Sequence, residues 1–402
     1  MDKPFLMLLT FLGLNFTVLQ AQDQVSDIYQ RLDKIGFENI RLKTLGNTLV
    51  LSYENNLYRN RTGALKEILD QLSKSGYDSL KVITLVNDMP LVVSQVKVSD
   101  WKKYASGQMT VAEMSHRFKL SYNTDDSWKP LNDSSVHNPH FKKVALVFYP
   151  QFLQMNIRTD QLYELQLNIA PALEVSLWRG MKFTGQVILP LYSDKWYGKE
   201  GKKIRAGFVT LSQEFRLPGS ILGRTVIGKF NAGRYGSDMS LTHYLMRGQS
   251  YVKINAGVTG EYQYYEGGWF RNNINTLTYS IKSGYYWKPN NIQIDVSANR
   301  YINSDFGMRG DFTRYWGETA IGLFAMMGIN GKYYGGFHFV FAIGPKHRKN
   351  YRSLQIQSPD YFDWEYNTST DGVFGQYYET RPNENRVEHF YNPNFILKNL
   401  AK

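Results

Sequence analysis

Ser240 and His243 are the residues that could begin nucleophilic catalysis, because a serine hydroxyl needs a base close by to be activated. They lie three positions apart in a stretch that alternates like a β-strand. Side chains three apart on a strand point to opposite faces, so the hydroxyl and the imidazole cannot meet. Such a site also needs a third group that orients the base. We therefore predict that the chain is not an enzyme.

The run His137-Asn138-Pro139-His140 is the candidate metal site, because two imidazoles close together can ligate a metal ion. Pro139 and the absence of an acidic neighbour favour a turn instead. The chain has no cysteine, which excludes disulfides, thiolate zinc sites, a cysteine nucleophile and a lipoprotein anchor. Its glycines lie in strand and turn patterns, not in a phosphate-cradling loop. We predict no metal and no cofactor.

Charged residues in the alternating segments form the candidate binding site. An arginine can bind a carboxylate through two hydrogen bonds, and aromatic faces can stack on sugar rings. Such a lining could bind or guide an acidic or hydroxyl-rich chain. In the alternative interpretation, the charges pair with one another across a filled, non-conducting interior. The candidate lining residues are Lys229, Arg234, Lys253, Glu261, Asp295, Arg314 and Glu318, with Asp238, Arg247, Arg309 and Asp311 near strand ends.

The strands that would position these charges are seen most clearly in 251–265. Apolar and polar side chains alternate there, which indicates a strand with one apolar and one wet face. An ordinary strand has roughly five or six residues, whereas a membrane-spanning strand needs about nine to eleven. Tyr262 and Tyr264 end the apolar face, where a strand would leave hydrocarbon for lipid headgroups. The segment is therefore typical of a membrane barrel.

The same alternation recurs through 144–344 and predicts a mainly β chain that forms an outer-membrane antiparallel β-barrel of about twelve strands. Tight turns at one end and longer loops at the other fit this architecture. A soluble β-sandwich is the alternative, but its strands should be shorter and its turns more evenly spaced. The predicted strands are 144–158, 162–178, 181–191, 204–217, 224–233, 238–247, 250–265, 275–287, 291–301, 309–317, 318–328 and 332–344.

Residues 1–22 are typical of a signal peptide, with a short charged start, an apolar stretch over 4–19 and a small-residue cleavage site at Ala21-Gln22. A buried N-terminal helix is the alternative. Export, and the lack of a later apolar run of spanning length, predict the bacterial outer membrane as the location. The surplus of 12 positive charges then points to lipid headgroups or acidic polysaccharide, and not to nucleic acid.

The remaining chain divides into three parts. Residues 23–104 predict a small periplasmic α+β module, because helical spacing of apolar residues alternates there with paired strand patterns. Residues 105–143 are interpreted as a polar linker, which could hang free or tuck into the barrel mouth. Residues 345–402 lose the alternation and are interpreted as a C-terminal periplasmic tail. The tail could fold back as a plug, pack on the N-terminal module or be loosely ordered.

Residues 228–236 read Gly-Lys-Phe-Asn-Ala-Gly-Arg-Tyr-Gly and are followed by the apolar run 241–247. Together they resemble a recurring barrel segment of the YjbH family, outer-membrane proteins of exopolysaccharide production. Longer members of that family look like two barrels in one chain, whereas this chain has residues for one. Further segments that resemble the family are 165–177, 180–191 and 215–219 in the strands, and 50–64 in the module.

The resemblance implies an outer-membrane protein that works with polysaccharide assembly or export. We predict a non-enzymatic barrel that takes part in exopolysaccharide biosynthesis or export. Its expected partners are outer-membrane lipid, an acidic exopolysaccharide, and periplasmic or outer-membrane proteins. The alternative function is a structural or secretion-machinery barrel whose periplasmic module docks partner proteins. An even number of strands would leave both the module and the tail in the periplasm.

Overall fold

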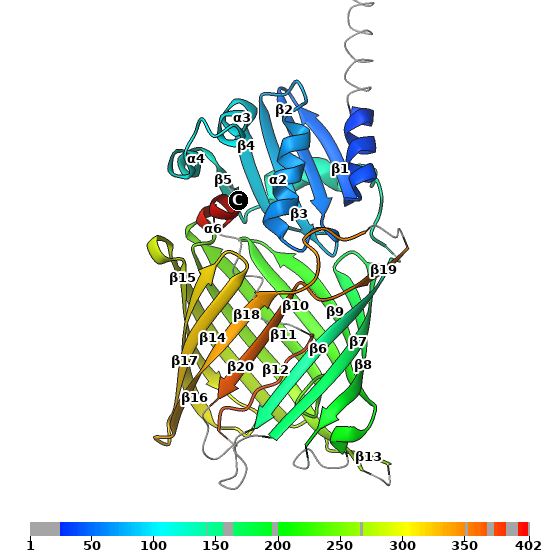
Figure 1. The fold of residues 1–402 in the computed structure, drawn as a ribbon, viewed down its shortest axis with the longest axis vertical. Coiled ribbons are helices and arrows are strands. Elements are labelled where there is room, and N and C mark those ends of the chain that lie inside the picture. The colour runs from blue at the N-terminus through cyan, green and yellow to red at the C-terminus, as the bar shows by residue number, and fades with distance from the viewer. Residues whose placement is uncertain are drawn as a thin grey trace, which may run out of the picture.

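A computed structural model describes residues 25–141, 143–155, 164–194, 200–265, 268–349, 353–367, 374–382 and 393–400. An N-terminal module (25–141) stands on one end of a large sheet whose strands run obliquely to the long axis (Figure 1). The predicted signal peptide, 1–22, lies outside the described residues. No helix in the described ranges is both long and apolar enough to cross a membrane, a finding that does not bear on strands.

The module contains a five-stranded sheet in the order β1-β2-β3-β4-β5. Two antiparallel hairpins, β1–β2 and β3–β4, are joined by helix α2, so that β2 and β3 run parallel. Asn87 and Asp88 turn the second hairpin with φ of 49° and 60°, the left-handed values that a type I′ turn needs. The elements are β1 (Glu38–Leu45), β2 (Thr48–Glu54), α2 (Arg61–Leu72), β3 (Ser79–Val86) and β4 (Met89–Lys97), after a helix over 25–35.

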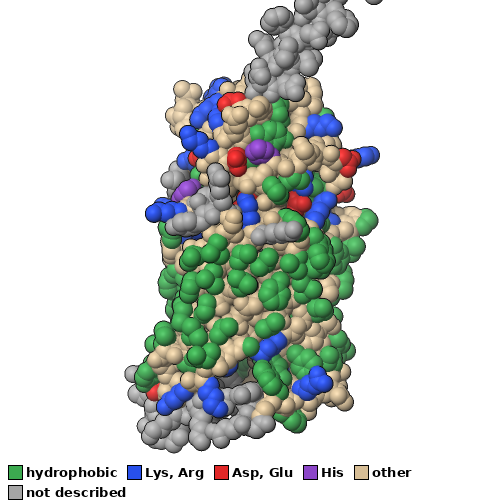
Figure 2. Space-filling model, turned by 90° about the vertical axis from the view of Figure 1, so that its right-hand side faces the viewer, with side chains coloured by type: hydrophobic (Ala, Val, Ile, Leu, Met, Phe, Trp, Pro, Cys, Tyr) green, Lys and Arg blue, Asp and Glu red, His purple; other side chains and the backbone are tan. Residues whose placement is uncertain are grey.

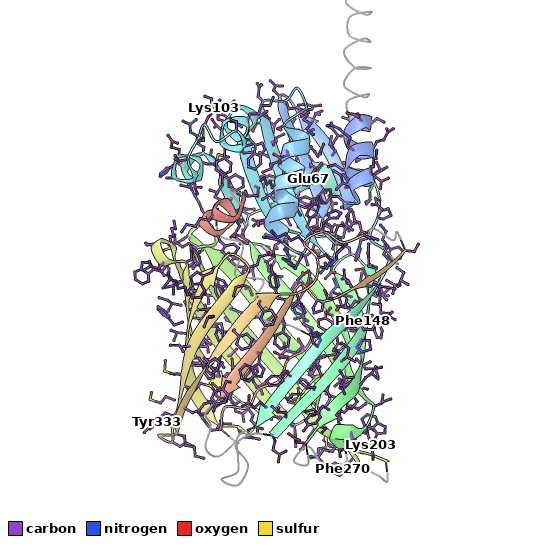
Figure 3. The ribbon with its side chains drawn as sticks, in the orientation of Figure 1. Glu67, Lys103, Phe148, Lys203, Phe270 and Tyr333 are labelled. Atoms are coloured by element: carbon purple, nitrogen blue, oxygen red, sulfur yellow. The ribbon has the colours of Figure 1, made fainter. Side chains whose placement is uncertain are left out.

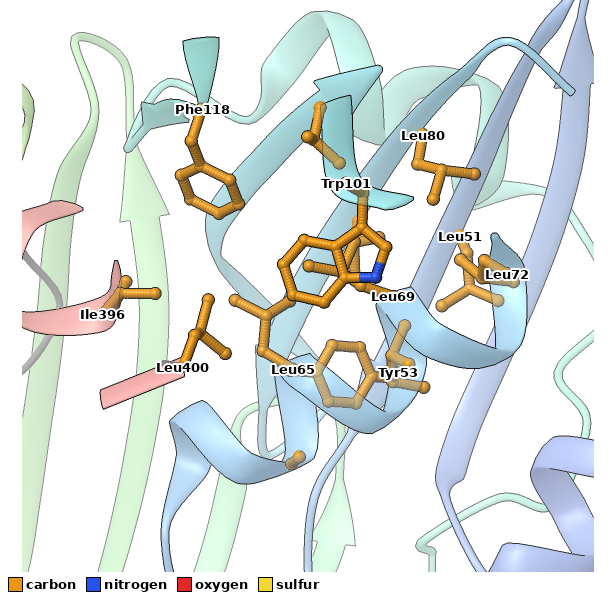
Figure 4. Packing of buried hydrophobic residues seen from close by; sticks show 14 of the residues in the cluster. Leu51, Tyr53, Leu65, Leu69, Leu72, Leu80, Trp101, Phe118, Ile396 and Leu400 are labelled. Carbon is orange, nitrogen blue, oxygen red and sulfur yellow. The ribbon is translucent and has the colours of Figure 1, made fainter. Parts of the chain in front are cut away.

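Apolar side chains from the sheet and the helices form the core of the module, and Trp101 lies at its centre (Figure 4). Helix α2 begins where the Asn60 side chain accepts a hydrogen bond from the Thr62 amide at 2.9 Å, which satisfies one of the free donors of its first turn. Leu65 and Leu69 lie one turn apart on the buried face of this helix. The indole nitrogen of Trp101 donates to Asp70 at 2.9 Å, so the large ring is buried with its polar atom paired.

The prediction of a polar linker over 105–143 is wrong, because the described part of this segment folds into the module. Strand β5 pairs with the edge of the module sheet, and Met114 and Phe118 are buried in the module core. These apolar residues are spaced singly among polar ones, which made the segment look like a connection. The elements are α3 (Val98–Ala105), α4 (Val111–Arg117), β5 (Lys119–Ser121) and α5 (Asp125–Asn132).

The large sheet has 15 strands among the described residues. Each of the twelve predicted segments overlaps one of them, and three further strands were not predicted. Strands β6 to β18 pair with their sequence neighbours in antiparallel fashion, apart from the short β13, which pairs only with β12. The strands are β6 (Val144–Met155), β7 (Glu164–Trp178), β8 (Met181–Ser193), β9 (Arg205–Leu217), β10 (Ile221–Lys229), β11 (Arg234–Leu245), β12 (Ser250–Tyr265), β13 (Gly268–Arg271), β14 (Thr276–Trp287), β15 (Ile292–Arg300), β16 (Phe306–Trp316), β17 (Thr319–Gly328) and β18 (Tyr333–Ala342).

The sheet has an apolar outer face and a polar inner face. On β7, Gln166 and Asn168 are buried whereas Leu167 and Leu173 are about 40% exposed. Such alternation follows from the twofold period of a strand. Green, apolar side chains accordingly cover the outer surface between the two ends of the sheet (Figure 2). This polarity is the reverse of that of a soluble protein, whose apolar residues are inside.

Aromatic residues mark both ends of the apolar surface. Trp178, Trp287 and Trp316 are the last residues of β7, β14 and β16 at the module end, and each is exposed. Phe270 and Tyr333 are exposed at the opposite end (Figure 3). Aromatic side chains prefer the membrane–water interface, so two aromatic rims around an apolar band are typical of membrane barrels.

The prediction of a separate tail over 345–402 is wrong for two of its segments. Strand β19 (Leu354–Gln357) pairs in parallel with β6, and strand β20 (Tyr361–Asn367) pairs antiparallel with β18. Strands β6 and β18 are therefore each paired with a strand from the same short stretch of chain. The rings of Phe152 on β6 and Trp364 on β20 lie 5.4 Å apart. Helix α6 (Pro393–Leu400) packs on the module.

Candidate functional site

Four of the seven predicted lining residues point to the inner face of the sheet. Arg234 is buried and donates to the Thr259 hydroxyl at 2.9 and 3.1 Å, and Glu261 is its partner in the strand register. Asp295 is buried and accepts hydrogen bonds from Tyr251 at 2.9 Å and Gln293 at 2.8 Å. The fourth residue is Lys253, which lines a cavity at the module end.

The other three predicted lining residues lie elsewhere. Arg314 is exposed on the outer face with its guanidinium 4.9 Å from the centre of the Trp316 ring. Lys229 has the same strand parity as the exposed Ile227, and its ammonium lies 4.6 Å from the Tyr262 ring centre. Glu318 lies in a turn at the module end, where it accepts hydrogen bonds from a module arginine.

Arg309 and Asp311, which were predicted to lie near strand ends, form a charge network on the inner face of the sheet. The guanidinium of Arg309 donates to Asp311 at 2.6 Å and to Glu365 at 2.7 Å, and its carbon is 4.0 Å from the Phe324 ring centre. His338 is buried beside Asp311, 4.0 Å from the nearest carboxylate oxygen. Glu365 belongs to β20 in the predicted tail, so sequence patterning could not assign it to the interior. The network supports the interpretation in which interior charges pair with one another.

Residues 374–382, here called the strap, cross the interior of the sheet. Phe374 is buried against Tyr301 and Tyr334, with ring centres 5.8 and 5.5 Å away. The Tyr334 hydroxyl donates to the Phe374 carbonyl at 2.7 Å. The Gly375 amide donates to Asp305 at 2.7 Å, in the loop between β15 and β16. This half of the strap is therefore held at the end far from the module.

Tyr378 fixes the next part of the strap to the opposite wall. Its ring stacks on Phe230 with centres 5.3 Å apart, and its hydroxyl lies 3.0 Å from Asp238 and 3.1 Å from Thr278. A side chain at Gly257 would place its Cβ 1.8 Å from that hydroxyl, so a larger residue there would displace the Tyr378 ring. The strap ends at Arg381 and Pro382, which line the cavity at the module end.

The cavity lies between the module and the inner face of the large sheet and has a volume of about 360 Å³. The module supplies its side through the end of β2 and the β3–β4 hairpin, and strands β6 to β12 supply inward-facing residues. Seven Lys or Arg and four Asp or Glu side chains of the described residues line it. A cavity with such a polar lining can hold a hydrophilic ligand. The cationic lining residues are Arg61, Lys182, Arg216, Arg224, Lys253, Arg348 and Arg381.

The module is fixed to the rim of the sheet at separate points around the cavity. Arg59 forms a two-pronged ion pair with Glu318, with distances of 2.7 and 3.2 Å. Arg216 at the end of β9 donates to the Pro90 carbonyl at 2.7 Å. The Gly180 amide, in the β7–β8 turn, donates to the Asn87 carbonyl at 2.7 Å. These contacts hold the roof of the cavity over the strands.

In the structure, the side chains of the predicted serine–histidine pair lie apart, and the predicted two-histidine run forms a turn. Ser240 lines the cavity, whereas His243 has the opposite strand parity. His140 binds Glu38 at 2.5 Å, an acidic partner that is distant in sequence, and Asn138 turns the chain with φ of 49°. Among the described residues, no group of three His, Asp or Glu side chains could hold a metal ion.

The ion pair of Glu38 and His140 shifts both groups. Burial alone would raise the pKa of Glu38, but the hydrogen bond and charge of His140 and the nearby Lys143 hold it below its ordinary value. Burial alone would lower the pKa of His140, but the hydrogen bond to Glu38 raises it above its ordinary value. The pair is therefore a charged link between β1 and the segment that leads into β6.

Residues 16–216 match the YjbH family, described as "Exopolysaccharide biosynthesis protein YbjH". The chain belongs to the YjbH family. The match covers the module and the first strands of the large sheet, so both parts fall within the family's pattern.

Other comparisons add little to the family assignment. No curated protein matches the chain. Among solved structures, the chain is similar to OmpTdeltaL8, a loop L8 deletion mutant of OmpT, an outer membrane protein of Vibrio cholerae. That match has 8% identity and a TM-score of 0.28, and it covers 49% of this chain and 87% of the other.

Proposed function

We propose that this member of the YjbH family is a non-enzymatic outer-membrane barrel that takes part in exopolysaccharide biosynthesis or export. The observation that carries the proposal is the polarity of the large sheet, which exposes an apolar band with aromatic rims and buries polar side chains. In water, so much exposed apolar surface would drive aggregation, whereas lipid covers it without cost. Membership of an exopolysaccharide family supplies the biological role.

The proposal includes closure of the sheet into a barrel. Closure removes free strand edges. The unpaired backbone N–H and C=O groups of such an edge would find no hydrogen-bond partner in lipid. The segment that carries β19 and β20 binds β6 on one side and β18 on the other, and the Phe152–Trp364 contact joins the same two ends. In this arrangement the module and the turns beside it face the periplasm, where the module meets partner proteins. The longer loops then face outward.

Two experiments test the proposal. The first asks whether the protein fractionates with outer membranes and migrates differently on a gel before and after heating, as folded barrels do. A protein that is soluble and monodisperse without detergent would contradict the barrel. The second deletes the gene and measures surface polysaccharide. Unchanged polysaccharide with impaired protein secretion would favour a secretion-machinery barrel instead.

A further inference from the structure

We propose that the cavity beneath the module binds a short segment of a polysaccharide whose sugars carry carboxylates. This inference rests on the proposed function and adds a ligand class and a site to it. The volume of about 360 Å³ falls within the roughly 300–1,000 Å³ of pockets that bind small ligands. The space can therefore hold a few sugar rings and no folded macromolecule.

The charge of the lining selects an anion. Seven cationic and four acidic side chains of the described residues line the cavity, which leaves three positive charges in excess. Two acids are already engaged, since Glu174 pairs with Lys182 and Asp360 pairs with Arg348. A carboxylate that enters this space replaces lost hydration with charge-assisted hydrogen bonds.

Arg216 and Lys253 are the cations best placed to meet such a carboxylate. Arg216 donates to the backbone carbonyls of Pro90, Leu91 and Tyr122 and forms no ion pair with a described residue, while its Nε is buried without an acceptor there. Lys253 lines the cavity from β12 and likewise forms no ion pair within the described ranges. A buried cationic donor without an acceptor, such as the Arg216 Nε, is costly unless a ligand completes it.

A band of hydroxyl groups lines the same cavity. Neighbouring strands place them at successive inward positions, so Thr184 faces Thr210 across β8 and β9. Hydroxyls both donate and accept hydrogen bonds, as sugar hydroxyls do, so they suit a carbohydrate better than a simple ion. The hydroxyl-bearing residues of the band are Thr184, Thr210, Ser212, Ser240 and Thr242.

The strap shapes how the ligand is held. Arg381 and Pro382 line the cavity, and the rest of the strap fills the interior beyond them through Tyr378 and Phe374. A sugar chain that enters the cavity therefore meets the strap and docks against it. In this arrangement the site holds a segment of the chain and does not thread it through the sheet.

Titration of the purified full-length protein in detergent micelles with short oligogalacturonate tests the site. The control ligand is the methyl-esterified form of the same oligomer, which keeps the rings and loses the charge. We expect the acid form to bind at least about tenfold more tightly, the factor of one charge-assisted contact. Equal affinities would overturn the proposal. Inorganic phosphate that competes at the same concentration as the oligomer would also overturn it, by showing a general anion site.

Matched variants locate the site. Lys253→Gln should weaken oligogalacturonate binding about tenfold, because it removes one unpaired cation from the cavity. Arg314→Gln removes an exposed cation on the outer face and should leave binding unchanged. Both proteins must keep the heat-modifiable gel shift of the parent. If Lys253→Gln binds like the parent, the cavity is not the site. That result would leave the polysaccharide phenotype of a gene deletion, and hence the proposed function, standing.

Discussion

The hydroxyl of Tyr104 in helix α3 donates a 2.8 Å hydrogen bond to the carbonyl of Leu397 in helix α6. The two residues are 293 positions apart, and both are buried in the core of the N-terminal module. Ile396 and Leu400 pack there beside Phe118 (Figure 4). The C-terminal helix is thus a structural part of the N-terminal module.

Leu397→Ala should destabilise the module, because it removes a fully buried side chain and leaves a cavity. The expected loss is about 2–5 kcal/mol, measured as denaturant-dependent protease cleavage of the module in the folded, micelle-bound protein. Asn399→Ala is the control, since among the described residues that side chain bonds to the Phe395 carbonyl of its own helix alone. Equal cleavage of the two variants would show that α6 does not stabilise the module.

The pair Arg59–Glu318 should couple the module to the sheet. A double-mutant cycle with Arg59→Met and Glu318→Gln should give a coupling free energy of about 1–3 kcal/mol, because the pair is two-pronged and largely shielded from water. The readout is the cross-linking rate of a cysteine pair introduced across the junction, which is specific because the chain has no cysteine of its own. Additive effects would rule the coupling out.

The Glu38–His140 pair predicts a pH window for the stability of the module. Because the pKa of Glu38 is lowered below 4.5, its contribution is lost as pH falls through the folded value. Because the pKa of His140 is raised above 6.5, its contribution is complete below 6.5 and is lost as pH rises through the folded value. Stability gained from the pair should therefore be greatest between 4.5 and 6.5, and His140→Gln should flatten this maximum in denaturation curves. A maximum that survives the substitution would contradict the assignment.

Tyr378→Ala should loosen the strap, because it removes both the stacking on Phe230 and the hydrogen bond to Asp238. We expect larger or more frequent conductance steps in planar bilayers than for the parent. Tyr377→Ala is the matched control, since the neighbouring tyrosine is 48% exposed. If both variants conduct as the parent does, Tyr378 does not control ion flow through the interior.

Leu323→Arg should impair membrane insertion. Leu323 is 64% exposed near the middle of β17, where a charge would lie deepest in lipid. The expected cost is about 2–4 kcal/mol, seen as a smaller heat-modifiable fraction on refolding into vesicles. Tyr333→Arg, at a strand end, should cost only about 0–1 kcal/mol. Equal losses at both positions would argue against lipid around the sheet.

Strand positions could be predicted from the sequence because a twofold period of apolar residues persists over many residues in each strand. The failures have separate causes. Arg314 and Lys229 were assigned to the interior for their charge, although each lies two residues from an exposed apolar residue, Phe312 and Ile227, and so has outward parity. The strand face on which a residue lies was thus a better guide to the inner lining than its charge.

A tail that folds back as a plug was one of the alternatives for 345–402, but the places of the strap and Glu365 could not be predicted, because they depend on contacts across the interior. Phe374 and Tyr378 stand in a polar stretch without a period, and only the walls around them bury them. Local sequence carries no signal for such long-range packing. The cavity was missed for the same reason, since it exists only where the module meets the strands.

The segment 353–400 also constrains the order of assembly. Its described parts pair with β6 and β18, cross the interior, and complete a core whose other members begin near residue 28. Contacts this distant in sequence form slowly, because a long loop must close before they stabilise anything. We therefore expect the large sheet and the module core to be completed only after the described parts of this segment have joined the rest of the fold. Until then, strands that still lack their partners are prone to aggregate.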